Sequence, residues 1–301
     1  IFKDNELMTK YGGSLFIANK NQSNIVDKEL KYAQSVSANV FEIDKKSVLN
    51  MVPIIKEEYL DRAIHEPDSK VMDVDLIHQG FARGLKENNG KILFNEEAKE
   101  ITKKNGLWNV ITKNNKFISP ILINAAGAWC DEVSILAGCD PLNLSPKRRT
   151  VVIFKNSSNL NTSQWPVVID IEDNFYFKSE AGNILASPAD ETDSPPCDAQ
   201  PEELDIAMTI DRLQNATNFN IKKINHKWAG LRSFFPDRTP IVGEDPLQSG
   251  FYWLAGQGGY GIQTSPGISK IIECLITGAK WPDYLSDNSI TPETLSPKRK
   301  I

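Results

Sequence analysis

The chain has 301 residues, of which 40% are hydrophobic and 24% charged, a composition typical of a globular protein with one large core or two smaller ones. Its formal net charge of −5 provides no broad basic face, so we expect neither nucleic acid nor an anionic membrane as the main partner. No apolar run approaches the roughly 20 residues of a membrane span, and no signal-peptide pattern opens the sequence, so we expect a cytoplasmic protein without a transmembrane segment.

Cysteine and histidine are too scattered to indicate a metal or redox site. The four cysteines, Cys130, Cys139, Cys197 and Cys274, include no C-x-x-C pair and are expected to be free thiols. The three histidines are isolated from one another, and residues of this kind are usually structural or solvated. The sequence therefore predicts no metal site.

The N-terminal part of the chain predicts short helices and strands. Apolar residues at helical spacing predict a helix within residues 21–40, and the alternation in "VFEID" predicts a short strand after it. Asp44 is placed to cap a further short helix, which Pro53 ends.

The next segment, residues 73–94, predicts a helix followed by a strand. Asp73 or Asp75 would begin the helix, and Gly90 would close it before a strand in "KILF". Two further strand-like runs meet across Asn105-Gly106, which is the strongest short-range signal for a hairpin.

A buried strand at residues 121–124 runs into a turn of small residues and then a helix. Small residues at such a turn let the backbone approach a flat or charged ligand, and the amides at the start of the helix favour an anion. Tight packing of strand on helix, without a ligand, explains the same pattern. The residues alone leave both interpretations open.

From Arg148 to Ala189 the pattern changes to short β-rich runs broken by Gly, Pro, Asn and Asp, which predict a sheet. A polar, proline-rich loop then leads to a helix at residues 204–218. Another strand follows, carrying "HKWAGLRSFFPDRTPIVG".

The stretch from Phe251 to Leu275 contains a literal G-x-G-x-x-G, formed by Gly256, Gly258 and Gly261, between an apolar strand and a helix. A dinucleotide-binding fingerprint also needs a second strand, with an acidic residue about 20 positions further on. The sequence after the helix has three prolines and no apolar strand. We therefore expect these glycines to serve another kind of strand-to-helix turn.

Four motifs follow one another along the chain: "ILINAAGAWCDEVSILAG", "LSPKRRTVVIF", "WAGLRSFFPDRTPIVG" and "FYWLAGQGGYGIQTSPG". These motifs and their order resemble those of the D-amino acid oxidase family of FAD-dependent amine and amino acid oxidoreductases. The similarity is closer to the D-arginine dehydrogenase branch than to other branches of the family. The similarity covers almost the whole chain from about Val71 onward. It implies an α/β fold in which an incomplete, Rossmann-like FAD-binding domain is joined to a mainly antiparallel substrate-binding sheet.

The resemblance also implies a division of the chain into domains. The FAD-binding-type domain is expected to comprise residues 1–20, 68–145 and 228–285, the substrate-binding domain residues 21–67 and 146–227, and a C-terminal tail residues 286–301. The family's phosphate-binding glycine motif lies near the start of full-length members, and this chain has no counterpart. We therefore expect a fragment or one of two subunits, which binds FAD weakly or not at all alone and can self-associate at an unpaired sheet edge.

In this family the glycines of "GQGGYG" lie beside the redox-active end of the flavin. The following helix directs its N-terminus at the pyrimidine side of the ring, where about half a positive charge favours the anionic reduced form. The residues that the resemblance places near FAD are Ala98, Ala125, Ala126, Gly127, Trp129, Gly230, Gly258, Gly259, Tyr260, Gly261, Ile262 and Gln263.

The resemblance further implies a substrate site. Arg232 would hold the substrate carboxylate, which its planar fork suits, and the hydroxyl of Tyr176 would bind the same group. Arg149 would be a third polar group, and the carbonyl of Gly259 would accept from the substrate amine. By residue type alone, an arginine in a strand is usually solvated or salt-bridged. Because Arg148 and Arg149 face opposite sides of a strand, only one of them is expected in the pocket.

The implied reaction is hydride transfer from the substrate α-carbon to flavin N5, which yields an imino acid. Relatives that prefer cationic D-amino acids have an acidic residue where this chain has Gly13 or Ser14, so a neutral D-amino acid or sarcosine fits equally well. An α-hydroxy acid or a secondary amine is an alternative substrate. A non-catalytic subunit, which binds substrate or a partner chain without holding FAD itself, is an alternative function. The residues do not specify the electron acceptor.

Overall fold

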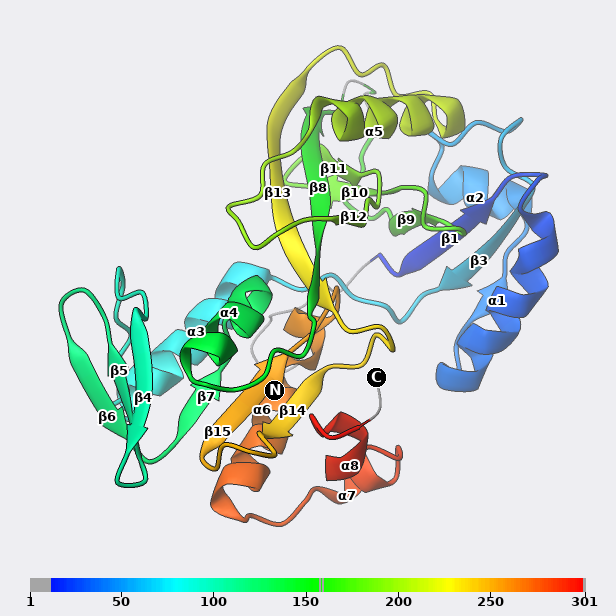
Figure 1. Ribbon diagram of the computed structural model, residues 1–301. Coiled ribbons are helices and arrows are strands. Elements are labelled where there is room, and N and C mark those ends of the chain that lie inside the picture. Colours follow the sequence, from blue (N-terminus) through cyan, green and yellow to red (C-terminus); the bar gives the residue numbers. More distant parts are fainter. Residues whose placement is uncertain (1–11, 157, 159, 300–301) are drawn as a thin grey trace.

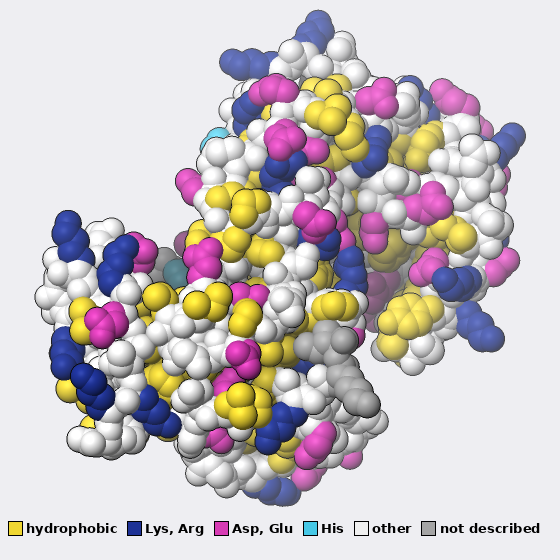
Figure 2. Space-filling model, viewed as in Figure 1, with side chains coloured by type: hydrophobic (Ala, Val, Ile, Leu, Met, Phe, Trp, Pro, Cys, Tyr) yellow, Lys and Arg dark blue, Asp and Glu magenta, His cyan; other side chains and the backbone are white. Residues whose placement is uncertain are grey.

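The computed structural model describes residues 12–299 apart from residues 157 and 159. Within them the protein is mixed α/β, with one nine-stranded sheet and two three-stranded sheets (Figure 1). On the face shown in Figure 2, acidic and basic side chains are interspersed, and no large region of one sign stands out.

The nine-stranded sheet has the order β12-β8-β11-β10-β9-β1-β3-β2, with β13 also paired to β8. Its pairs are antiparallel except for β1 with β9. The strands are β1 (Ser14–Ala18), β2 (Phe41–Glu42), β3 (Arg62–Glu66), β8 (Ser145–Lys155), β9 (Val167–Asp170), β10 (Tyr176–Glu180), β11 (Asn183–Ser187), β12 (Thr192–Asp193) and β13 (Ile224–Phe234).

Two helices cover one face of this sheet: α2 (Lys45–Met51) and α5 (Glu203–Ala216) contribute to a core that includes Val152, Phe154 and Phe177. α1 (Ser23–Val36) packs on the other face, against Phe16 and Ile64 of β1 and β3. Because side chains alternate along a strand, the neighbours of Val152, Phe154 and Phe177 point to the opposite face. That second face carries the cavities described below.

The second sheet has the order β14-β15-β7, formed by β14 (Ile241–Glu244), β15 (Phe251–Ala255) and β7 (Leu122–Asn124). β15 and β7 are parallel, and α6 (Gly261–Thr277) packs its Ile268 and Ile271 against Val242 and Tyr252. The chain then forms two short helices, α7 (Asp283–Ser286) and α8 (Pro292–Leu295).

The third sheet is the meander β4 (Glu100–Lys104), β5 (Leu107–Ile111) and β6 (Lys116–Ser119), which lies beside α3 (Val74–Glu87) in Figure 1. Asn105 and Gly106 join β4 to β5 with positive φ angles of 52° and 79°. This confirms the predicted hairpin, because a turn of this kind needs left-handed backbone at both central residues. The 3₁₀ turn η2 (Gly127–Trp129) and α4 (Cys130–Leu136) follow β7.

Most predicted elements are present, but the strand expected in residues 91–94 is wrong. These residues have no strand partner in the described part of the chain, and extended backbone without ladder hydrogen bonds is not a strand. Their side chains are open to solvent, with Leu93 51% and Phe94 81% exposed. β7 is likewise paired on one side only among the described strands.

The sheet pairings bear on the expected domain ranges. β1, from the range 1–20, pairs with β3 and β9 in the nine-stranded sheet, and all of β13 pairs with β8, including its residues 228–234. Residues 1–11 lie outside the described part. The domain boundaries remain a prediction.

The four cysteines are free, as expected. No helix of the described residues has both the length and the apolar character that crossing a bilayer requires.

Candidate active site

The pairing of β8 with β13 places the predicted substrate residues on one face. Arg149 lies opposite Gly230, and Arg232 lies opposite Lys147. Directly opposed residues of an antiparallel pair project to the same side of the sheet. Arg148 projects to the other side, where it donates to Asp205 over 3.0 Å. The structure therefore places Arg149, and not Arg148, on the open face.

Arg149, Arg232, Tyr176 and Gly259 line one cavity of about 630 Å³, here named the arginine cavity. β8, β13, β10 and the turn before α6 each contribute one of the four. The other residues around it are Val167, Ile169, Glu172, Asp173, Ala189, Glu191, Phe234, Arg238 and Tyr260. Residues that are distant in sequence thus meet at one site.

Two of the three arginines in this cavity have protein groups as partners. Arg149 donates through Nε to the carbonyl of Asp190 over 2.7 Å, and its Nη2 lies 3.5 Å from Glu191. Arg238 forms an ion pair with the same Glu191 and lies over the ring of Phe234. Glu191 therefore connects two cations across the cavity wall.

Arg232 has no such partner. Among the described residues, its guanidinium has neither a hydrogen bond nor an ion pair, although the side chain is half-buried. Burial, followed by repulsion from Arg149, lowers the pKa of Arg232. A buried cation without a counter-ion is costly unless an anion joins it. The arrangement is therefore suited to binding an anionic group.

Tyr176 and Gly259 complete the surroundings of Arg232. The hydroxyl of Tyr176 likewise has no hydrogen bond among the described residues, so it is free for a ligand. A Cβ at Gly259 would lie 3.1 Å from Nη1 of Arg232. Glycine therefore lets the guanidinium lie directly against the main chain.

A second cavity, of about 540 Å³, opens at the N-terminus of α6 and is here named the glycine cavity. It shares Arg232 and Gly259 with the arginine cavity. Six of the residues predicted to contact FAD line it, namely Ala125, Gly127, Gly258, Gly259, Gly261 and Ile262. α6 has no side-chain cap and no acidic residue in its first turn. Its uncapped amides and positive end therefore favour an electron-rich group.

The motif glycines also have a packing role that the sequence did not reveal. Gly256 has a φ of 75°, and a Cβ there would lie 2.4 Å from the ring of Phe235. A Cβ at Gly258 would lie 2.4 Å from Phe234. The turn can therefore pack on the end of β13 only if both positions are glycine.

The remaining residues that were predicted to contact the cofactor do not line the glycine cavity. Ala98 and Ala126 pack against the core around Trp253, and Trp129 is 41% exposed. Gly230 has open space where a side chain would be.

Tyr260 lines the arginine cavity instead of the glycine cavity, and Gln263 is exposed in the first turn of α6. The sequence reasoning missed Glu191 and Arg238, which meet only through folding. The motif "PDRTP" contains Arg238, but no local signal pairs it with Glu191.

The family described as "FAD dependent oxidoreductase" (DAO) matches the chain over residues 3–275. The chain belongs to this family. The resemblance inferred from the four motifs is therefore confirmed.

Individual relatives agree with this family. A "FAD-dependent oxidoreductase domain-containing protein 1" of Xenopus laevis is 29% identical over 178 residues, which make up 52% of this chain and 34% of that protein. The match thus spans about a third of that relative's length.

Solved structures share the fold. A glycine oxidase from Geobacillus kaustophilus has a TM-score of 0.81 at 16% identity, covering 98% of this chain and 76% of that one. An L-proline dehydrogenase from P. horikoshii has a TM-score of 0.79 at 21% identity, covering 98% and 78%. The predicted α/β class is confirmed by these matches.

Proposed function

We propose that this chain provides the substrate site and the flavin-contacting turn of an oxidoreductase that acts on amino acids or related amines bearing a carboxylate. The observation that carries the proposal is the unpaired, half-buried guanidinium of Arg232, in a cavity shared with Tyr176 and Arg149. Arg232 also lines the glycine cavity, so a carboxylate bound to it would lie beside the place proposed for the cofactor.

The residues present fit the redox end of FAD. Small residues and open space at Gly127 leave room for a flat group, and the uncapped start of α6 suits its electron-rich edge. Ala125, Gly127, Gly258 and Gly261 would hold it, and bound FAD would supply a hydride acceptor. Each element would thus serve either the cofactor or the substrate.

The side chains of the arginine cavity would orient the substrate. Arg232 would bind both carboxylate oxygens, and Tyr176 would donate to one of them. The Gly259 carbonyl would accept from the amine, so that the α-carbon is held in one orientation. Preference for a D-amino acid is the finer part of the proposal and rests on the order of the motifs. The glycine oxidase and the L-proline dehydrogenase, whose names specify amino acid oxidation, support the substrate class.

The test is replacement of Arg232. Arg232→Ala removes the charge, and Arg232→Lys removes the bidentate geometry. Each should lower kcat/KM by a factor that corresponds to a loss of about 2–4 kcal/mol in transition-state binding. The measurement is turnover of a D-amino acid and sarcosine panel, with FAD and an artificial acceptor, by the chain fused to an N-terminal segment of the family. Calorimetry, which needs no turnover, should show that both variants also bind acetate more weakly than the wild type.

Arg83→Ala is the matched control, because Arg83 lies on α3 and lines none of the described cavities. It should change neither turnover nor acetate affinity. If the Arg232 variants behave like this control, Arg232 does not bind the substrate.

A further inference from the structure

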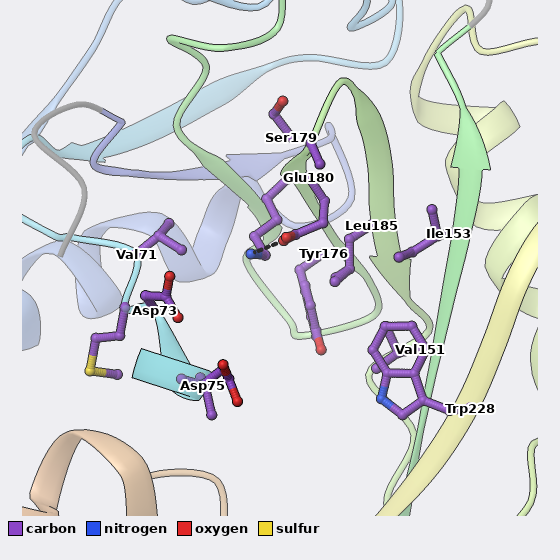
Figure 3. A pocket seen from close by; sticks show the side chains of 14 residues that line it. Val71, Asp73, Asp75, Val151, Ile153, Tyr176, Ser179, Glu180, Leu185 and Trp228 are labelled. Carbon is purple, nitrogen blue, oxygen red and sulfur yellow. Dashed lines mark hydrogen bonds and ion pairs between the residues drawn. The ribbon is translucent and has the colours of Figure 1, made fainter. Parts of the chain in front are cut away.

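A third cavity, of about 820 Å³, lies on the same open face of the large sheet (Figure 3). Its wall on the sheet side includes four apolar side chains, Val151, Ile153, Leu185 and Trp228, next to polar residues of β10. Across from them lies the chain segment that leads into α3. The other lining residues are Val71, Met72, Asp73, Val74, Asp75, Tyr176, Lys178, Ser179, Glu180 and Ala181. We name it the apolar cavity.

The strand register makes this cavity a continuation of the arginine cavity. Val151 follows Arg149 by two residues on β8, so both project to the same face. Trp228 lies directly opposite Val151 on β13. Tyr176 lines both cavities. A ligand bound to Arg232 can therefore extend past Tyr176 into the apolar cavity.

The two cavities differ in chemistry. Six charged side chains line the arginine cavity, whereas the apolar cavity has a continuous apolar part, formed by Val151, Ile153, Leu185 and Trp228. Lys178, the single cation in this lining, forms an ion pair with Glu180, drawn in Figure 3. Asp73 and Asp75 lie across from the apolar wall (Figure 3). A ligand with a polar head and an apolar tail fits this pair of cavities, while a negatively charged tail would be repelled by the carboxylates of Asp73 and Asp75.

We propose that the apolar cavity binds the side chain of the substrate, and that the substrate is an amino acid with a large aliphatic or aromatic side chain. This rests on the proposed function, because it takes Arg232 as the site of the carboxylate. A glycine or sarcosine molecule would leave the cavity unfilled. Each buried methylene should strengthen binding about fourfold.

The experiment uses acetate, hexanoate and 3-phenylpropanoate as probes of the 301-residue chain, with affinities measured by calorimetry. Hexanoate and 3-phenylpropanoate should bind at least about tenfold more tightly than acetate. Val74→Trp should fill the cavity from the α3 side and abolish that gain, while leaving acetate binding unchanged. Val74 is 50% exposed, so the fold does not depend on it.

Leu76→Trp is the matched control, because Leu76 lies on the same helix, is 43% exposed and does not line the cavity. This variant should still bind hexanoate and 3-phenylpropanoate more tightly than acetate, by the same factor as the wild type. Equal affinities for the three probes in the wild type, or equal behaviour of the two tryptophan variants, would overturn the inference.

Arg232→Ala separates this inference from the proposed function. If acetate and hexanoate bind the wild type equally and both lose affinity in Arg232→Ala, the proposed function stands and the apolar cavity is not the side-chain site. If neither probe needs Arg232, the proposed function fails.

Discussion

Arg148 and Arg232 lie on neighbouring strands of one sheet, but their guanidinium groups have different surroundings. Arg148 is neutralised by Asp205 and Glu202 on the side covered by α5. Arg232 faces a cavity and has no counter-ion among the described residues. Because ion pairs already balance the charge of Arg148, Arg232 is the one of these two arginines that is suited to binding an added anion.

His65 gives a prediction for the dependence of stability on pH. It is half-buried in β3, with its ring edge to face with Phe41, and burial lowers its pKa below the usual 6.5. The unfolded chain therefore binds a proton at higher pH than the folded chain. This contribution to stability is complete above about pH 6.5 and is lost as the pH falls through the lowered pKa.

The measurement is the free energy of unfolding in urea from about pH 7.5 to about pH 5. The wild type should lose more stability on acidification than His65→Gln, which has no titrating ring. Parallel pH profiles for the two proteins would show that burial of His65 does not contribute.

At the scale of elements, the turn between β15 and α6 depends on close packing. Gly256→Ala must accommodate both a positive φ and a methyl group 2.4 Å from the buried ring of Phe235. Gly182→Ala is the matched control, since Gly182 has a φ of 78° and open space around the added methyl. Overpacking should make Gly256→Ala about 1–3 kcal/mol more destabilising than the control. The free energy of unfolding measures this, and equal losses would mean that the Phe235 contact imposes no constraint.

Local elements were the most predictable. Asp44 and Asp73 cap α2 and α3 as expected, because a cap needs only a carboxylate and an amide three residues apart. The Asn105-Gly106 hairpin is equally local. The strand expected at residues 91–94 failed because a strand needs a partner, which no local pattern can specify.

At the scale of the whole molecule, unpaired edges and exposed apolar side chains predict self-association. Leu93 and Phe94 are exposed, and β7 is paired on one side only among the described strands. We expect the weight-average mass to rise with protein concentration in sedimentation experiments, and Phe94→Lys to weaken this rise.

Leu247→Lys is the control for this prediction, because Leu247 is 76% exposed in the connection between β14 and β15. It should leave the association unchanged. A monomer at all concentrations, or equal effects of both substitutions, would contradict a role for Phe94.

The sequence alone determined the family, through four motifs in a characteristic order, and the identity of Arg149, Tyr176, Arg232 and Gly259 as candidate site residues. It also determined the elements whose signals are local, since caps, turns and alternation act over a few residues. Tertiary structure decided everything that depends on register and on contacts between distant segments. Within the described residues it left Arg232 without a counter-ion, joined Glu191 to Arg149 and Arg238, and set the apolar cavity beside Tyr176. Burial and pairing of charge arise only when strands align, so no stretch of sequence could specify them.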